Sequence, residues 1–456
     1  MKKDQRILFI DFLIIFFSII LINIFFNPNC NQYYDSWKYW DIGKGFLKGD
    51  IELLRGYFFP GFLGLLYGVF GDYSQYIWVV FSALLEAFYF VYITSVLWDN
   101  NMSDKMVFRV GRYINYLVIL ILFSGLFYYT LSDLWTFIFA SSSLAIIKLL
   151  NKTNLIKYNI VYCFIFGMLL YISYNIRTIY LFFSVGALVL LIISLRKSFT
   201  GIKSLICFIT TVLGTFVSAL PQFILNRKVL GLLSFKVQTT NLFSLQLIWG
   251  TAYQQYATYI GDEVDNPCVF FIDPVGQNVL SSVGIKLNAT EVISGMDSIS
   301  IISYFKMVLT HPMEYVGIYF RHLVNMLFPM WPSQYVNNFN NNKIPYAIIS
   351  FTLFYLFVLV LLKRCYLSFY NQIILLPILL PVIAITPGAV ESRYFLPLFY
   401  YMAGTVCLNT DYNKLLDEIK GNKLQHIVVF VCIFLLFVSI WSTMLASYSG
   451  PIDIHI

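Results

Sequence analysis

Long apolar segments dominate this chain and restrict what it can fold into. A helix that crosses a bilayer needs about 20 mostly apolar residues. Eleven stretches of 14 to 22 residues approach or meet that length. They are Ile7–Phe26, Tyr76–Leu97, Tyr113–Thr130, Leu131–Leu150, Ile160–Ile176, Thr178–Leu195, Leu205–Leu225, Pro345–Leu362, Ile373–Pro387, Phe395–Leu408 and Ile427–Ala446. The pattern predicts an all-α polytopic membrane protein with about eleven transmembrane helices, within a range of 10–12.

The composition excludes the other classes of protein. The chain is 59% hydrophobic and only 12% charged, whereas an average soluble domain is about 25% charged and 45–50% apolar. A soluble fold could not bury this much apolar surface, and the aromatic content excludes disorder. Seven cysteines in 456 residues are too few for a disulfide scaffold. Only Cys30 and Cys268 fall in expected outside loops, and whether they pair stays open.

Lys and Arg predict the orientation. With a cytoplasmic N-terminus, 17 of the 30 basic residues fall in the expected cytoplasmic segments, each of which carries at least two. This is the positive-inside pattern. It indicates a multi-pass membrane protein with its C-terminus outside, and the Lys-, Asn- and Ile-rich composition is compatible with an AT-rich bacterial genome and hence with a bacterial cytoplasmic membrane. The first span has no small-residue cleavage site after it, so we interpret it as a retained anchor rather than a signal peptide.

Two outside loops divide the chain into three parts. The expected parts are an N-terminal transmembrane module (1–225) that contains the first outside loop (27–75), a large outside loop (226–343) and a C-terminal transmembrane module (344–456). The apolar but charged segment Ile299–Phe328 is typical of interfacial helices on the outer face. A twelfth span there is the alternative, but it would move two basic residues after Leu362 to the outside.

The first outside loop holds the strongest group of candidate residues. If its first part is helical, Asp35, Lys38 and Tyr39 share one face, because residues three and four apart are neighbours. The carboxylate could deprotonate an acceptor hydroxyl, and the cation and Tyr39 could bind substrate. The competing interpretation is an interfacial helix with an aromatic belt and solvated charges.

The outer turns supply further charges. Asp133 lies at the start of the fourth span. It could be a functional acid, or it could cap the helix. Arg177 is expected outside, against the positive-inside trend. It could bind phosphate, or its side chain could snorkel to the interface. Glu391, Arg393 and Tyr394 lie in a late outer turn, where the two charges could also simply pair. Together these turns would gather acids and arginines on one face.

The four histidines form no convincing metal site. His311 and His322 both fall outside, but they are eleven residues apart. We therefore expect no cofactor, while a divalent metal stays open. No feature indicates a nucleic-acid partner.

Several short motifs, taken in order, resemble the GT-C glycosyltransferases, in particular bacterial relatives of protein O-mannosyltransferases and of lipid A aminoarabinose transferase. The first loop reads Asp-x-x-Lys-Tyr, then Gly-Asp and Phe-Pro-Gly-Phe, with one proline where the family commonly has two. The other matching elements are Ser132-Asp133-Leu134, Arg177, Thr310-His311-Pro312-Met313-Glu314-Tyr315 and Ser392-Arg393-Tyr394-Phe395-Leu396-Pro397.

The resemblance implies an inverting transfer of a sugar from a polyprenyl-phosphate-linked donor at the outer membrane face, in cell-envelope polysaccharide biosynthesis. It implies Asp35 as the general base, with Asp133 as a second catalytic residue. The expected substrate-binding residues are Lys38, Tyr39, Arg177, His311, Glu391, Arg393 and Tyr394. Outward-facing cations would stabilise the charge on the departing phosphate.

Two other functions stay open. A lipid-linked polysaccharide polymerase or ligase would use outside arginines to hold pyrophosphate. A lipid-saccharide flippase or transporter would place polar groups near the middle of the membrane, where Glu86 is the clearest charge. The sequence does not identify the sugar, the acceptor (a glycan, a lipid or a protein) or the oligomeric state.

Overall fold

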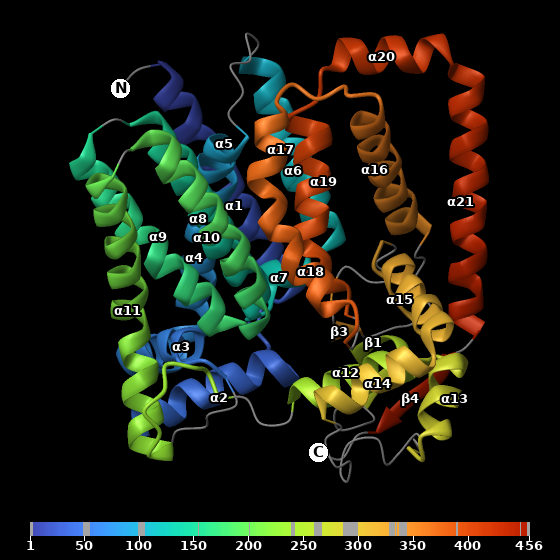
Figure 1. The fold of residues 1–456 in the computed structure, drawn as a ribbon, viewed down its shortest axis with the longest axis horizontal. Coiled ribbons are helices and arrows are strands. Elements are labelled where there is room, and N and C mark those ends of the chain that lie inside the picture. The colour runs from blue at the N-terminus through green and yellow to red at the C-terminus, as the bar shows by residue number, and fades with distance from the viewer. Residues whose placement is uncertain are drawn as a thin grey trace.

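The chain folds into a helical bundle with a smaller α/β body at one end (Figure 1). The computed structural model describes residues 3–48, 55–98, 105–153, 155–199, 201–238, 242–259, 267–285, 300–327, 333, 335–336, 344–388, 391–446 and 448–453. The longer helices of the bundle are α1 (Lys3–Phe26), α4 (Ser74–Phe88), α6 (Lys105–Leu122), α8 (Ser132–Lys152), α9 (Ile156–Ile176), α10 (Leu181–Ser198), α11 (Ile202–Leu230), α16 (Ile344–Leu362), α19 (Leu396–Leu408) and α21 (Lys423–Ala446).

Shorter elements connect these helices. They are α2 (Tyr34–Lys48), α3 (Phe58–Phe70), η1 (Gly71–Tyr73), the π-helical turn η2 (Tyr89–Ile93), α5 (Thr94–Leu97), α7 (Gly125–Tyr128), η3 (Thr178–Tyr180), α17 (Phe369–Leu375), η4 (Leu376–Leu379), α18 (Leu380–Ile385), η5 (Ser392–Phe395) and α20 (Tyr412–Gly421).

Within the described part of the chain, seven helices are long and apolar enough to cross a membrane, or eight if α20 and α21, bent by 91°, form one span. The expected count of eleven is therefore not confirmed. The difference arises where charge or proline interrupts the apolar runs. The helix α6 starts at Lys105, eight residues before the expected span, and ends at Leu122. Proline residues divide Phe369–Ile385 into three short helical pieces, and α19 has only 13 residues.

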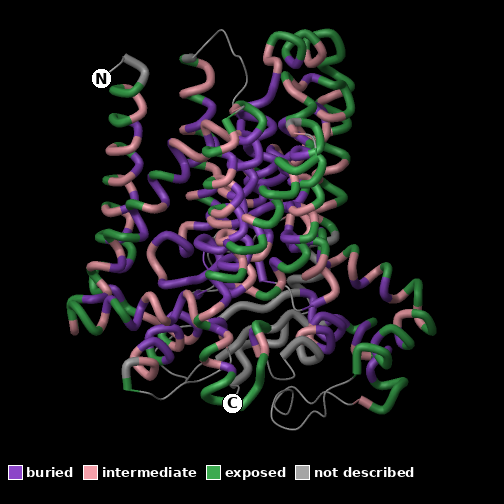
Figure 2. Tube along the Cα trace, turned by 60° about the vertical axis from the view of Figure 1, so that its left-hand side comes forward, coloured by how far each residue is buried: buried purple, intermediate pink, exposed green. Residues whose placement is uncertain are grey.

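The bundle surface is apolar, as a lipid bilayer environment requires. Figure 2 shows the buried residues in the interior and the exposed ones on the periphery. Many of the exposed side chains are large and hydrophobic, among them Phe17 on α1, Val185 on α10 and Leu213 on α11. The helix α8, in contrast, is buried over most of its length. Helices α9 and α11 pack closely because Gly167 and Gly214 each lie against the backbone of the other helix.

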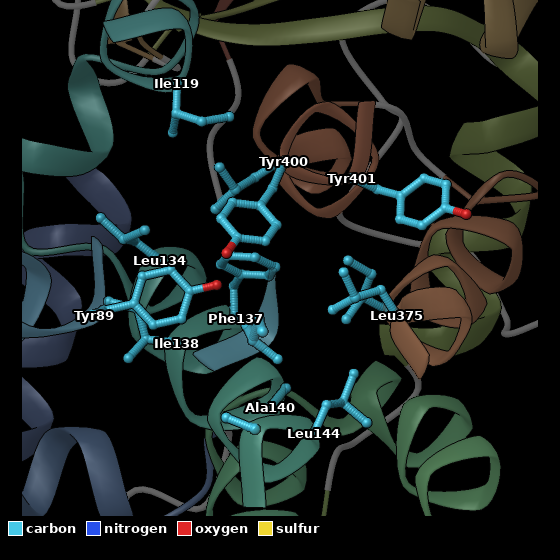
Figure 3. Close-up of a cluster of buried hydrophobic side chains, with 14 of the residues drawn as sticks. Tyr89, Ile119, Leu134, Phe137, Ile138, Ala140, Leu144, Leu375, Tyr400 and Tyr401 are labelled. Carbon is cyan, nitrogen blue, oxygen red and sulfur yellow. The ribbon is translucent and has the colours of Figure 1, made fainter. Parts of the chain in front are cut away.

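Aromatic side chains fill the centre of the bundle. Tyr89, Phe137 and Tyr400 come from three segments that are far apart in the sequence, and they point toward one another in Figure 3. The ring centroids of Phe137 and Tyr400 are 4.9 Å apart, and Tyr89 lies 5.7 Å from each of the other two rings. All three rings are buried. This packing joins α8, which carries Asp133 in its first turn, to α19, which follows η5 and its Arg393.

The small body contains a four-stranded sheet with the order β3-β1-β2-β4, which the all-α prediction missed. Strands β1 and β2 form an antiparallel pair, and the C-terminal strand β4 pairs antiparallel with β2. Local sequence patterns could not predict this sheet, because its strand β4 comes from the far end of the chain and pairs with β2 over a long sequence separation. The elements are α12 (Leu242–Ala252), β1 (Tyr253–Tyr259), β2 (Pro267–Ile272), α13 (Pro274–Ser282), α14 (Ile301–Thr310), α15 (Pro312–Leu327), β3 (Tyr335–Val336) and β4 (Tyr448–Asp453).

The segment expected to lie at the interface forms two helices, α14 and α15, which are divided at His311. Neither is long enough to be a candidate span. Ile302, Leu309 and Met313 are each more than three-quarters exposed. An apolar outer face on short helices that also carry charge is typical of interfacial helices.

Candidate functional site

The helix α2 places Asp35 at the end of the bundle where α1 finishes. The side chain of Ser36 stabilises the helix start, because its Oγ accepts a hydrogen bond from the N–H of Tyr33 at 2.8 Å. The hydroxyl of Tyr335 accepts from the N–H of Ser36 at 3.1 Å and donates to the carbonyl of Tyr33 at 2.8 Å. Asp35 therefore lies buried in the first turn of a fixed helix.

Two arginines hold the carboxylate of Asp35. Arg55 Nη2 donates to Oδ1 at 2.8 Å, and Arg393 Nη2 donates to Oδ2 at 2.8 Å. Arg55 follows α2 and Arg393 belongs to η5, so this contact joins the first outside loop to the C-terminal part of the chain. Burial alone would raise the pKa of Asp35, but Arg55 and Arg393 outweigh it and hold the pKa well below its usual range.

Asp133 and Arg177 form a second pair. Arg177 Nη2 donates to Oδ2 of Asp133 at 2.7 Å, and its Nε donates to Oγ of Ser132 at 3.2 Å. Asp133 lies in the first turn of α8, but the N-cap is Leu131 and no side chain caps the helix. The expected capping role is therefore absent. The carboxylate instead binds the arginine that lies between α9 and η3.

Arg393 is the central cation. Its Nε lies 2.5 Å from Oε2 of Glu391 and its Nη2 donates to Oε1 of Glu391 at 3.0 Å. Its Nη1 lies 3.5 Å from Oδ2 of Asp133. One guanidinium thus contacts three carboxylates, those of Asp35, Asp133 and Glu391, all buried. We refer to Asp35, Arg55, Asp133, Arg177, Glu391 and Arg393 as the arginine–carboxylate cluster.

The three acids of the cluster differ in their environment. Glu391 contacts Arg393 and accepts a hydrogen bond from the hydroxyl of Tyr394 at 2.9 Å. Burial, together with the nearby Asp35 and Asp133 carboxylates, raises the pKa of Glu391 although Arg393 opposes the shift. The pKa values of Asp35 and Glu391 are therefore displaced in opposite directions within one cluster.

Two tyrosines support the cations. The Tyr39 hydroxyl lies 2.7 Å from Oγ of Ser132 and accepts from Nη1 of Arg55 at 3.2 Å. The ring of Tyr39 also lies 5.0 Å from the Arg55 guanidinium. The ring of Tyr394 lies 5.1 Å from Arg177 and 5.3 Å from Arg393. Cations over aromatic faces are stabilised in this way, so both tyrosines help to fix the arginines.

A small cavity adjoins the cluster. Its polar wall is formed by Asp133, Arg177 and Arg393, and its other walls come from η3, α18 and the start of α19. Arg393, one of the lining residues, has its Nη1 3.5 Å from Oδ2 of Asp133 but makes no hydrogen bond through this atom among the described residues. The remaining lining residues are Ile179, Tyr180, Pro381, Ile385, Tyr394, Leu396 and Pro397. The cavity therefore combines two arginines with a largely apolar wall.

Two predicted residues are not among those with contacts to the cluster described above. Lys38 lies half-buried on α2, one turn after Asp35. His311 lies at the junction of α14 and α15, where its Nε2 is 3.4 Å from Oγ of Ser282 and its Nδ1 is 3.8 Å from Glu314. Cys30, considered above for a disulfide, is a buried free thiol.

The sequence prediction missed Arg55. Its position depends on Gly56, where a Cβ atom would overlap the backbone carbonyl of Asn175. The N–H of Phe58 also donates to Oδ1 of Asn175 at 2.8 Å. These contacts place the segment after Arg55 against the end of α9. A basic residue directly before Gly56 in the same acidic loop was the available signal.

In the part of the chain that the structure describes, no group of three or more His, Cys, Asp and Glu side chains could hold a metal ion. The three carboxylates of the cluster each contact at least one arginine, so each already has a cationic partner. The residues that could bind a ligand here are thus Arg177 and Arg393.

The fold and the site define a polytopic helical membrane protein with a buried arginine–carboxylate cluster at one end of its bundle. Comparison with known proteins adds no family to this description, because no family model, curated protein or solved structure matches the chain.

Proposed function

We propose that this protein is a glycosyltransferase of the GT-C type, which moves a sugar from a polyprenyl-phosphate donor to an acceptor at the outer face of a bacterial cytoplasmic membrane. The observation that supports this proposal most directly is the cavity with Arg177 and Arg393 on one wall and apolar side chains on the others. An amphiphilic anion, with a phosphate attached to a hydrocarbon chain, matches both kinds of wall.

The arginines suit the departing phosphate. Guanidinium groups bind phosphate oxygens in bidentate geometry. Sugar transfer breaks the bond between the anomeric carbon and the phosphate oxygen, and the electron pair stays on the phosphate. Cations that are already oriented stabilise this developing charge at little reorganisation cost. Arg177 and Arg393 both line the cavity and could supply this interaction, and Arg393 Nη1, 3.5 Å from Oδ2 of Asp133, makes no hydrogen bond among the described residues.

Asp35 would act on the acceptor. In an inverting displacement the acceptor oxygen bonds to the anomeric carbon from the opposite side, and its proton passes to a carboxylate. Asp35 is a weak base while both arginines hold it. A phosphate that draws Arg393 toward the cavity would leave Asp35 with Arg55 alone and make it more basic. Donor binding would thereby prepare the base, with Asp133 keeping Arg177 in place.

The outer-face assignment rests on the distribution of Lys and Arg in the short loops. In the structure, the cluster lies where α1 ends, and the two ends of the chain lie at opposite ends of the molecule in Figure 1. A cytoplasmic N-terminus would put both the cluster and the C-terminus outside.

A transfer assay tests the proposal. The purified protein in lipid nanodiscs would be given a panel of undecaprenyl-phosphate sugars, and the release of undecaprenyl phosphate would be measured with and without candidate acceptors. We expect Asp35→Asn to abolish transfer without changing expression or insertion, and Arg177→Ala to weaken donor use more than acceptor use. Glu418→Gln, at an acid of α20 that pairs with Lys363 and has no proposed role, is the matched control and should keep activity.

Each contrary result would point to a different part of the proposal or to one of the alternative functions. Normal transfer by Asp35→Asn would remove Asp35 as the base. A requirement for a diphosphate donor carrying a whole saccharide would favour the polymerase or ligase. Transport of lipid-linked saccharide without release of the lipid would favour the flippase. For the flippase, the buried Glu86 of α4, which accepts a hydrogen bond from Ser82 at 2.6 Å, would be the residue to substitute.

A further inference from the structure

The arginine–carboxylate cluster has no spare positive charge for an anion. Arg55 contacts Asp35, Arg177 contacts Asp133, and Arg393 contacts Glu391 and both aspartates. Three cations thus face three carboxylates. An anion that enters the cavity finds a donor atom on Arg393 but also the carboxylate of Asp133 on the same wall. A dianionic phosphate would therefore leave the buried cluster with two uncompensated negative charges, which is costly.

Protonation of one carboxylate would remove one of these uncompensated charges. The ion pairs of the three acids indicate that Glu391 is the one that takes up the proton. Asp35 keeps a separate cation, Arg55, at 2.8 Å when Arg393 turns to a ligand. Asp133 keeps Arg177 at 2.7 Å. Glu391 has both of its oxygens on Arg393, and no other cation contacts it among the described residues. When an anion competes for the guanidinium of Arg393, Glu391 is therefore the carboxylate that loses its cationic partner.

The other groups that face Glu391 come from three elements. Asp35 lies on α2 and Asp133 on α8, and both disfavour a charge on Glu391. Arg393 and Tyr394 come from η5, and Tyr394 donates to Oε1 of Glu391. The guanidinium of Arg177, which lies directly before η3, is placed over the ring of Tyr394, 5.1 Å from its centroid, rather than against Glu391. Burial raises the pKa of Glu391 in the unliganded protein, and loss of the Arg393 contact to an anion would shift that pKa in the same direction.

We propose that phosphate binding at Arg177 and Arg393 is coupled to the uptake of one proton by Glu391. This inference rests on the proposed function, because it concerns the same phosphate. It has a consequence for transfer: the donor is a monoanionic diester, whereas the released polyprenyl phosphate is a dianion, and the acceptor hydroxyl loses a proton. Glu391 can take over the proton that Asp35 receives from the acceptor hydroxyl while the phosphate carries the additional negative charge, so the net charge of the site stays constant and Asp35 returns to its ionised form.

Titration calorimetry tests the coupling with farnesyl phosphate as the probe, at about pH 7.5, where a phosphate monoester with a second pKa of about 6 is nearly all dianionic. The binding heat is compared in two buffers with different enthalpies of ionisation, which gives the number of protons taken up. We expect at least about half a proton per bound molecule for the wild-type protein and close to none for Glu391→Gln. Glu418→Gln, at an acid of α20 that pairs with Lys363, should behave like the wild type.

Inorganic phosphate in a parallel titration distinguishes a lipid headgroup from a free anion. Tighter binding of farnesyl phosphate supports the lipid-linked ligand, and equal binding with proton uptake supports a free phosphate at the same site. Proton-neutral binding by the wild type, or equal uptake by Glu391→Gln, overturns the proposal.

An infrared difference spectrum of the wild-type protein, recorded with and without farnesyl phosphate, tests the proton uptake without relying on the Glu391→Gln variant. Farnesyl phosphate should produce a protonated carboxylic acid band, and its absence would also refute the coupling. Failure of sugar transfer alone would leave these binding results unchanged, so the two proposals can fail separately.

Discussion

Replacing Arg393 by methionine tests whether this residue is the central cation of the cluster. The side chain of Arg393 is only 5% exposed and contacts three carboxylates. Methionine has a similar length but no charge. The substitution leaves Asp35 with Arg55 and Asp133 with Arg177, whereas Glu391 loses the arginine that binds both of its oxygens.

Removal of one partner from a buried ion pair costs about 3–5 kcal/mol, because the remaining charge stays buried without compensation. We therefore expect Arg393→Met to lower the free energy of unfolding by about this amount. In the double variant with Glu391→Gln, no charge is left unpaired at this position. Coupling between contacting residues is about 0.5–3 kcal/mol, so the double variant should recover about 2 kcal/mol relative to Arg393→Met.

Equilibrium unfolding by dodecyl sulfate in mixed micelles, followed by tryptophan fluorescence, measures all four members of this cycle. Arg393→Lys is the matched control, since it keeps the charge but cannot bind two carboxylates with a planar group. It should lie between the wild type and Arg393→Met. The reasoning is refuted if Arg393→Met is as stable as the wild type, or if adding Glu391→Gln to it gives no recovery.

Two further predictions concern pH and sidedness. Because Arg55 and Arg393 hold the pKa of Asp35 below its unfolded value of about 3.9, its ionised form stabilises the fold above that pH. The stability difference between the wild type and Asp35→Asn should therefore be constant from about pH 5 to 8 and shrink as the pH falls through the folded pKa; a difference that grows below pH 4 would contradict this. For sidedness, Trp37→Cys on α2 and Leu424→Cys on α21, both at exposed positions, should react with an impermeant thiol reagent from opposite sides of the membrane, with Trp37→Cys reacting from the outside. Reaction of both from one side would refute the orientation.

The sequence predicted the helical membrane class and the helix α2, because both depend on local patterns. Apolar runs of helical length are visible without any tertiary information, and α2 begins one residue before Asp35, where the helix was expected. The span count was less predictable. Hydropathy does not show where a proline divides a helix or where a helix such as α6 starts in its charged flank.

The cluster was predicted only as a set of candidates on one face. Charges at the outer ends of spans indicated Asp35, Asp133, Arg177, Glu391 and Arg393, and the structure brings all five together. Which acid contacts which arginine could not be predicted, since the partners Asp35 and Arg393 are 358 positions apart in the sequence. The role of Arg55 depended on a close approach at Gly56, which no local pattern reveals.

A second ion cluster in the same protein shows how a structural group differs from this one. Asp11 on α1 accepts hydrogen bonds from Arg109 and Tyr113 on one oxygen and from Arg112 on the other. There the carboxylate is central, both of its oxygens are occupied, and Arg109 reaches outward with 32% of its side chain exposed. This arrangement joins α1 to α6 and leaves the acid no capacity for a ligand.

At the other end of α1, about 22 Å away along 15 residues of helix, the arrangement is reversed. The central group is a cation, Arg393, which lines a cavity together with Arg177. A well-packed apolar core would stabilise a membrane bundle at least as well as a cluster in which Arg393 and all three carboxylates are buried. Unsatisfied donors do not distinguish the two clusters, because Arg112 Nε lacks a hydrogen-bond acceptor among the described residues as Arg393 Nη1 does, and Nη1 lies 3.5 Å from Oδ2 of Asp133. The position of two arginines at a cavity therefore argues for anion binding more strongly than the number of charges or of unsatisfied donors does.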